Sequence, residues 1–245
     1  MVNLKVIRNI KLNHLTRQIL AFLVHILTAS GLVFGFLALI AMDRADWKQG
    51  FLWLFLCLVI DGIDGSLARK IRAAEVLPSI DGKNIDFVVD FTSYCIVPAY
   101  FVYKSELLPE ELKLVSILII LISSAFYYGK KSMVVDDQFF EGFPVLWNIV
   151  VFVLFFVLNF DPYINFICIT FFGIMHFLPI RFAYPSKTKQ YVISHLFFSL
   201  LGLICALGIL SFYPNRVSLM NAGVMICLLY FMVFAIKDTL WKHRL

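Results

Sequence analysis

Four aspartates are the side chains of this sequence best suited to chemistry. Asp61 and Asp64 are three positions apart, and Asp86 and Asp90 are four apart, so each pair would share one face of an α-helix. Both pairs lie in strongly apolar surroundings, where an ionised group is costly and is therefore a functional candidate. Four facing carboxylates would repel one another at low dielectric constant, and two divalent cations would neutralise them. The spacing therefore predicts a dinuclear metal site shared by two helices.

Small residues and one arginine lie in register with these acids. Gly65 and Gly82 lack side chains, so a flat base or a diphosphate could approach the backbone closely at these points. Ala68, about one turn later on the same helix face, has only a small side chain and so also leaves room for a ligand. Arg69 supplies a permanently charged fork for phosphate oxygens. Together these residues predict that the metal site binds a phosphate-bearing ligand.

The elements that position these residues are expected to be membrane-spanning helices. The 245 residues are 61% hydrophobic and 15% charged, and the mean hydropathy is +0.88, which is outside the range of a soluble globular domain. We expect an all-α polytopic bundle of about eight transmembrane helices, with residues 1–245 forming a single membrane domain. The expected spans are 19–42, 50–71, 85–103, 112–128, 144–160, 163–180, 191–211 and 217–236.

Basic residues orient this bundle. Sixteen of the 21 lysines and arginines fall on one side of the predicted topology, which places both termini and the acidic motif on the cytoplasmic face. The first 18 residues alternate basic and apolar side chains and predict a short juxtamembrane helix on the headgroups. The net charge of +5 is therefore a topology signal with some attraction to anionic membrane lipid, and no nucleic acid partner is expected.

The two acidic segments together resemble a family signature. The pattern D-x2-D-G-x2-A-R, followed by G-x3-D-x3-D, resembles that of the CDP-alcohol phosphatidyltransferase family, and all eight defined positions match. The family places eight residues between the two halves, whereas residues 70–81 make twelve here. Four extra residues are about one helical turn, so the connection is longer while both halves can still face one another.

The resemblance implies an enzyme that moves a phosphatidyl group from CDP-diacylglycerol to an alcohol and releases CMP. It implies that Asp61, Asp64 and Asp86 hold two divalent ions that clamp the diphosphate. Asp90 would be a metal ligand and would also accept the proton of the attacking alcohol. Carboxylates suit Mn²⁺ or Mg²⁺. The residues implied to bind the CDP-lipid are Asp61, Asp64, Gly65, Ala68, Arg69 and Gly82.

Further details resemble the bacterial phosphatidylcholine synthase branch of that family. They are the longer connection with Pro78 and the segment 130–148. The branch implies choline as the acceptor, Mn²⁺ as the favoured metal and the bacterial inner membrane as the location; relatives are commonly homodimers. A quaternary ammonium cannot donate hydrogen bonds, so its site would combine aromatic faces with a nearby acid. The choline-binding candidates are Tyr94, Phe140, Glu141 and Trp147.

Other interpretations stay open. The acceptor could be serine, inositol or glycerol phosphate, although a phosphorylated acceptor needs more cations than the Lys130 and Lys131 of this region. A cation transporter would also carry intramembrane acids, but it would not need Arg69 in register with them. Arg181 and Lys187 would contact the donor's phosphate or glycerol portion, or would lie beside the headgroups as juxtamembrane cations.

Overall fold

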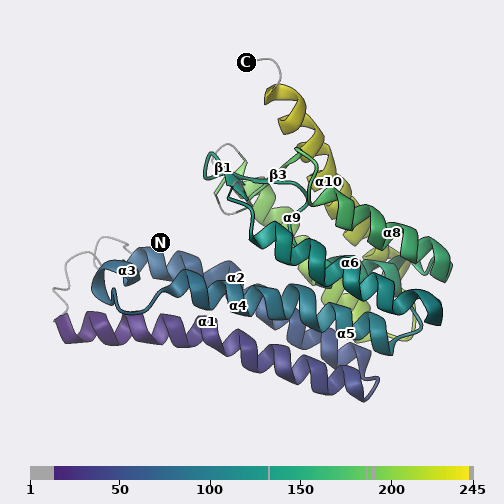
Figure 1. Cartoon of the computed structure of the whole chain (residues 1–245), viewed down its shortest axis with the longest axis horizontal. Helices are drawn as coiled ribbons and strands as arrows, with labels where there is room; N and C mark the ends of the chain where they lie inside the picture. Colours follow the sequence, from purple (N-terminus) through teal and green to yellow (C-terminus); the bar gives the residue numbers. More distant parts are fainter. Residues whose placement is uncertain (1–13, 132, 186, 189–190, 243–245) are drawn as a thin grey trace.

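The computed structural model describes residues 14–131, 133–185, 187–188 and 191–242. It is a bundle of helices with a small sheet at one side (Figure 1). The predicted juxtamembrane helix falls mostly in residues 1–13, outside the described residues. Its last residues belong to the first long helix.

The described part of the chain confirms the predicted all-α polytopic membrane bundle. Six of its helices are long and apolar enough to cross a membrane, and two of the eight predicted spans are shorter apolar helices. The long helices are α1 (His14–Asp43), α2 (Trp47–Ile71), the continuous run of α4 (Gly82–Phe91), η2 (Thr92–Ile96) and α5 (Val97–Lys104), α6 (Glu110–Tyr128), α9 (Val192–Phe212) and α10 (Ser218–Lys242). The shorter ones are the run of α7 (Trp147–Phe152) with η3 (Val153–Leu158), and α8 (Pro162–Met175).

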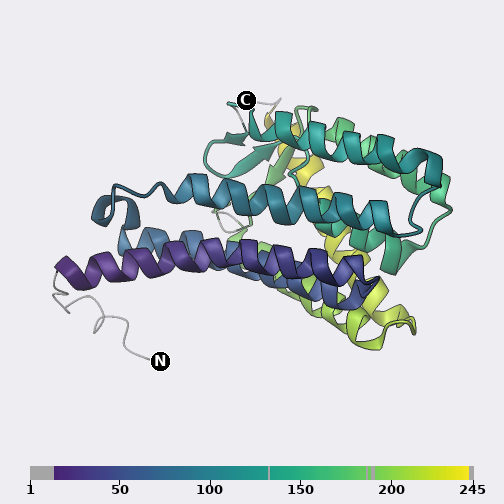
Figure 2. The ribbon, with the colours of Figure 1, turned by 60° about the horizontal axis from the view of Figure 1, so that its bottom comes forward.

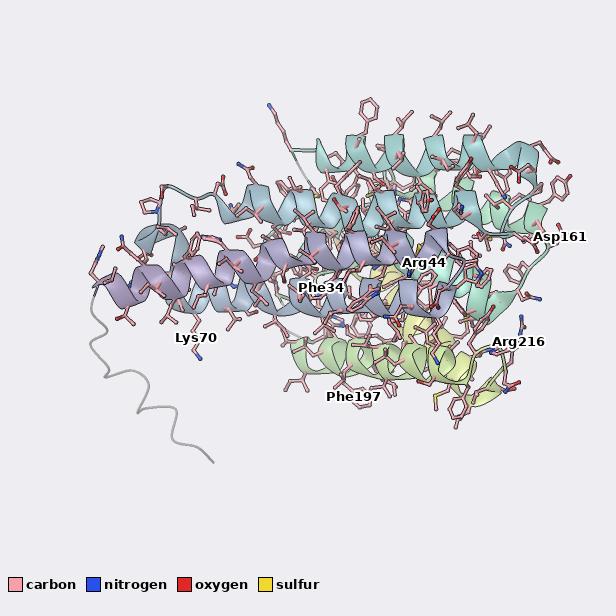
Figure 3. All side chains as sticks on the ribbon, turned by 90° about the horizontal axis from the view of Figure 1, so that it is seen from below. Phe34, Arg44, Lys70, Asp161, Phe197 and Arg216 are labelled. Atoms are coloured by element: carbon pink, nitrogen blue, oxygen red, sulfur yellow. The ribbon has the colours of Figure 1, made fainter. Side chains whose placement is uncertain are left out.

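The two ends of the bundle differ in the residues that they carry. Figure 3 shows Arg44, Asp161 and Arg216 toward one end and Lys70 toward the other. Phe34 and Phe197 lie between these ends, and the Phe197 side chain is exposed on the outer surface of the helices. An apolar band between two charged ends is the arrangement that a membrane-spanning bundle requires.

Capping side chains fix where the two helices that carry the acidic motif begin. The Asp46 side chain accepts a hydrogen bond from the backbone N–H of Gln49 (3.1 Å) and caps the start of α2. The Asp81 side chain accepts one from the N–H of Lys83 (3.0 Å) and caps the start of α4. Between them, the longer connection forms the short helix α3 (Ala73–Val76) after Arg72, which has a left-handed backbone with φ of 56°.

An aromatic core joins α2 to α5 and η3. Phe51 is fully buried, and its ring centroid lies 5.0 Å from that of Phe101, 5.5 Å from that of Phe152 and 5.2 Å from that of Phe156. All three pairs are edge-to-face, which is a favourable arrangement for aromatic rings. Helix α1 packs along α2 and α4 on the other side, as Figures 1 and 2 show. This packing fixes how α2 and α4 face one another.

A small antiparallel sheet joins two connections that the sequence predicts only as cytoplasmic loops. Its described strands are β1 (Val134–Val135), β2 (Phe139–Glu141) and β3 (Arg181–Ala183), in the order β1-β2-β3. Phe140 pairs with Val134 on one side and with Phe182 on the other. The backbone N–H of Arg181 donates to the hydroxyl of Thr239 on α10 (2.9 Å), which ties the sheet to the bundle.

Candidate metal centre and active site

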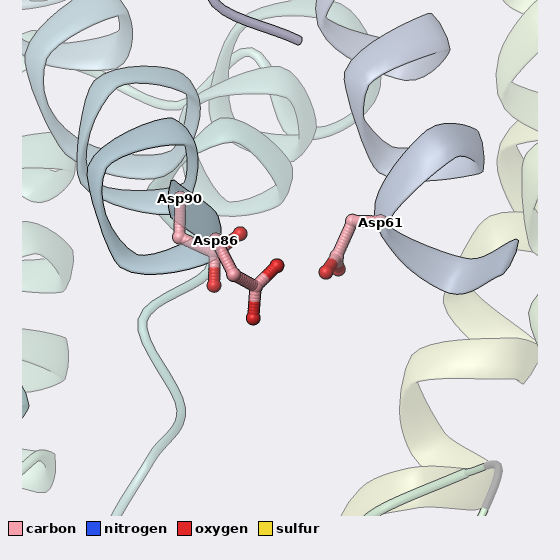
Figure 4. A group of neighbouring side chains, drawn as sticks. All are labelled: Asp61, Asp86 and Asp90. Carbon is pink, nitrogen blue, oxygen red and sulfur yellow. The ribbon is translucent and has the colours of Figure 1, made fainter. Parts of the chain in front are cut away.

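Two helices bring three of the four predicted acids together. Asp61 lies on α2, whereas Asp86 and Asp90 lie one turn apart on α4. One carboxylate oxygen from each residue lies within 4.8 Å of the other two. Figure 4 shows Asp61 facing the other two carboxylates across the space between the helices. The sequence predicts that the two helices turn their acidic faces toward one another, and these three acids do so.

Asp64 is placed differently from the other acids. It is not part of the group whose oxygens meet within 4.8 Å, and it is 5% exposed. Its polar neighbours include Thr28 on α1, and it interacts electrostatically with Arg69. It also interacts electrostatically with Asp86 and Asp90, so it lies beside the site. The structure therefore has three convergent acids with a fourth acid next to them.

The convergent carboxylates have few competing partners. Tyr94 donates a hydrogen bond from its hydroxyl to Oδ2 of Asp61 (2.8 Å), and Tyr128 lies beside Asp90. Oδ1 of Asp90 is buried and has no hydrogen-bond partner in the described part of the chain. A buried carboxylate oxygen without a partner is costly unless another group neutralises it. Three convergent carboxylates, one of which also carries an unsatisfied oxygen, fit a hard divalent cation.

A π-helix follows the acidic motif directly. The segment η2 begins two residues after Asp90 and contains Tyr94, which is 3% exposed. Such π segments inside α-helices are frequent at functional sites. The hydrogen bond between Tyr94 and Asp61 connects this segment to α2, so Tyr94 holds Asp61 in a fixed orientation toward α4. The sequence pattern carries no signal for this π segment.

The small residues of the motif have packing partners in the structure. A Cβ at Gly65 would lie 3.3 Å from Nη1 of Arg69. A Cβ at Gly82 would lie 2.7 Å from Cε1 of His25, on α1. Ala68 packs against a small buried cluster formed by Ala21, Ala73 and Val76. The sequence predicts that Gly82 leaves room for a ligand, whereas the structure fills this room with the His25 ring.

Tyr184 and Lys187 lie beside the acids although they are distant in sequence. Tyr184 interacts electrostatically with Asp61, Asp86 and Asp90, and Lys187 interacts with Asp86. Burial raises the pKa of Tyr184 to about 12. Burial, with a smaller contribution from the positive charge of Arg69, lowers the pKa of Lys187. The sequence left the roles of Arg181 and Lys187 open, and of these two cations Lys187 lies near the acids.

Arg181 has a different environment. Its Nη2 lies 3.2 Å from Oδ2 of Asp136, and its guanidinium lies over the ring of Phe139 at 5.7 Å. Its strand also pairs with β2, where Glu141 is the residue opposite. These contacts hold the sheet together.

Comparison with known proteins identifies the family. No family model matches this chain. The chain is 40% identical over 194 residues to a phosphatidylcholine synthase of Mesorhizobium japonicum, covering 79% of this chain and 71% of the relative. The corresponding identity with a phosphatidylcholine synthase of Agrobacterium fabrum is 41% over 191 residues, covering 78% of each protein. This chain belongs to the phosphatidylcholine synthase family. A relative of the same name in Pseudomonas aeruginosa is 37% identical over 169 residues, covering 69% of this chain and 71% of the relative.

Membership in the phosphatidylcholine synthase family agrees with the signature on α2 and α4.

The four choline-binding candidates have different partners in the structure. Tyr94 bonds to Asp61, and Phe140 stacks on Tyr184 with ring centroids 4.7 Å apart. Oε2 of Glu141 lies 3.8 Å from Nζ of Lys130. Trp147 is fully buried and donates from its indole nitrogen to the hydroxyl of Ser124 (2.8 Å).

Of these four candidates, two therefore have neighbours in the acidic site. Tyr94 contacts an acid directly, and Phe140 reaches the site through Tyr184. Sequence reasoning did not select Tyr184, because its closeness to Phe140 depends on the pairing of β2 with β3. The sequence did offer one signal for Tyr184, because an aromatic residue is found there in a short polar connection between two predicted spans.

Proposed function

We propose that this protein transfers the phosphatidyl group of CDP-diacylglycerol to the hydroxyl of choline, giving phosphatidylcholine and CMP. The observation that carries the proposal is the convergence of Asp61, Asp86 and Asp90 from two apolar helices. Membership in the phosphatidylcholine synthase family supports choline as the acceptor. In this proposal residues 1–245 act as one membrane domain.

The residues proposed to hold the cofactor are the three convergent acids, with Asp64 beside them. They would hold two divalent ions, Mn²⁺ or Mg²⁺, since carboxylates are the ligands that both prefer. The ions would neutralise negative charge on the attacked phosphate and on the departing CMP. Arg69, whose guanidinium lies beside Gly65, is proposed to bind phosphate oxygens of the CDP-lipid.

Asp90 is proposed to accept the proton of the choline hydroxyl. The choline oxygen forms a bond to the phosphorus that carries the lipid, and the bond from that phosphorus to the bridging oxygen of the diphosphate breaks. CMP leaves with the electron pair of that bond, and the proton moves to Asp90. The buried Oδ1 of Asp90, which has no hydrogen-bond partner among the described residues, is a suitable acceptor. No covalent intermediate with the protein is required.

The same proposal places the active site at the cytoplasmic face of the bacterial inner membrane. The distribution of lysine and arginine supports this orientation, with both termini on that side. A homodimer stays a prediction.

The test is to supply the purified protein with CDP-diacylglycerol and Mn²⁺ and to offer one alcohol at a time. We expect choline to release CMP and to form phosphatidylcholine. Release of CMP with serine, inositol or glycerol phosphate instead would keep the chemistry and replace the acceptor. Ion flux through vesicles without CDP-lipid, together with no release of CMP, would overturn the proposal in favour of a transporter.

Two variants test the assigned roles. Asp90→Asn should still bind CDP-diacylglycerol but lose turnover, because the amide cannot accept the proton. Asp61→Asn should weaken both turnover and the dependence on Mn²⁺, because it removes a charged ligand. Substantial turnover by Asp90→Asn would remove Asp90 as the base.

A further inference from the structure

An ammonium group already lies on an aromatic face beside the acidic site. Nζ of Lys187 is 4.1 Å from the centroid of the Tyr184 ring. Phe140 stacks on Tyr184 with an angle of 20° between the ring planes. The negative face of an aromatic ring attracts cations at this distance. Tyr184 therefore offers a cation-binding face, and Phe140 supports its ring.

The backbone around Tyr184 holds this ring in place. The N–H of Tyr184 donates to the carbonyl oxygen of Gln138 (2.9 Å), and the hydroxyl of Thr188 donates to the same oxygen (2.9 Å). The strand before Tyr184 pairs with β2, which carries Phe140. A ring fixed in this way loses little conformational entropy when a ligand binds to it.

Both acids and cations surround this position. Tyr184 interacts electrostatically with the three convergent acids. Asp137 and Asp86 attract Lys187, whereas Arg69 and Lys83 repel it. A cationic ligand that reaches the ring would also lie beside the carboxylates proposed to act on its hydroxyl.

We propose that the face of Tyr184 covered by Lys187 binds the quaternary ammonium of choline, and that choline displaces the Lys187 side chain from the ring. This inference rests on the proposed function, because it concerns the acceptor of that reaction. A quaternary ammonium has no N–H group, so it loses no hydrogen bond when it moves from water onto an aromatic face. Lys187 thus competes with the substrate for one position.

The experiment compares choline with its neutral analogue 3,3-dimethylbutan-1-ol, which has the same shape and no charge. Tyr184→Leu should raise the KM for choline about tenfold, as expected for the loss of a desolvated cation–π contact. It should also remove the preference for choline over the neutral alcohol. Tyr184→Phe keeps the ring and should preserve this preference. Tyr103→Leu is the matched control, because Tyr103 is an exposed tyrosine at the end of α5.

Lys187→Met tests the displacement. It removes the competing charge and keeps the length of the side chain, so the KM for choline should fall about threefold. A raised KM for CDP-diacylglycerol with an unchanged KM for choline would assign Lys187 to the donor's phosphate and overturn the proposal.

The outcomes separate this inference from the function on which it rests. If the wild-type protein releases no CMP with choline, the proposed function itself fails. If it releases CMP and Tyr184→Leu keeps both the KM for choline and the preference for the charged alcohol, only the inference fails. Should Tyr184→Leu not fold, thermal unfolding of the wild type and of Lys187→Met is measured with each alcohol. Choline should raise the melting temperature more than the neutral alcohol does, and more so in Lys187→Met; equal shifts would overturn the inference.

Discussion

Replacing Gly82 by alanine would test how α1 packs against the start of α4. A Cβ at position 82 would lie 2.7 Å from Cε1 and 3.0 Å from Nδ1 of His25. His25 is 6% exposed, and its buried Nε2 has no hydrogen-bond partner among the residues that the structure describes. The added methyl group must therefore push the ring aside or move α4 away from α1.

The expected cost follows from two opposing effects. Overpacking a well-packed site costs about 1–3 kcal/mol, and alanine stabilises a helix over glycine by up to about 1 kcal/mol. We therefore expect Gly82→Ala to lower the free energy of unfolding by about 1–2 kcal/mol. Because Asp86 lies one turn later on α4, the movement should also separate Asp86 from Asp61 and slow CMP release.

The assay is a double-mutant cycle with thermal unfolding in detergent and CMP release as readouts. His25→Ala removes the ring, so the double variant should recover about 1–2 kcal/mol relative to the sum of the single effects. Gly62→Ala is the matched control, since a Cβ there would have no atom of the described residues within 4 Å. Additive single effects would refute the reasoning from the His25 contact. Recovery of stability without activity would show that Gly82 is needed for the approach of a ligand.

Three further predictions concern single side chains. Gly142→Ala should destabilise the protein by about 3 kcal/mol or more, because φ is +91° and a Cβ would collide with the carbonyl of His176. The measurement is the yield of folded protein in detergent, and an unchanged yield would contradict this prediction. Tyr94→Phe should raise the Mn²⁺ concentration required for half-maximal activity severalfold, because Asp61 loses its hydrogen bond; an unchanged metal titration would contradict this role. Trp147→Phe should lower the stability by about 1–3 kcal/mol, because a buried serine hydroxyl loses its donor; an unchanged melting temperature would contradict it.

Helix positions followed closely from the sequence. The predicted span 191–211 corresponds to α9, and 85–103 corresponds to the run from Gly82 to Lys104. Apolar runs determine such helices locally, because each backbone hydrogen bond joins residues of the same segment. The pairing of Asp86 with Asp90 on one face followed for the same reason.

The small sheet did not follow from the sequence. Strand β2 pairs with β3, about 40 residues later in the chain, and each has three residues. Strands this short have too few positions for an alternating pattern, so only the folded chain pairs them. Tyr184 reaches Phe140 through this pairing, which is why the sequence motif alone did not select Tyr184.

By itself, the sequence determined that this protein is a membrane helix bundle with paired acids on two neighbouring helices, because hydropathy and helical periodicity act over a few residues. The tertiary structure decided that Asp61, Asp86 and Asp90 converge while Asp64 lies beside them. It also decided that His25 fills the space at Gly82. These features depend on the rotation of each helix against its neighbours, and that rotation is set by side chains far apart in the chain.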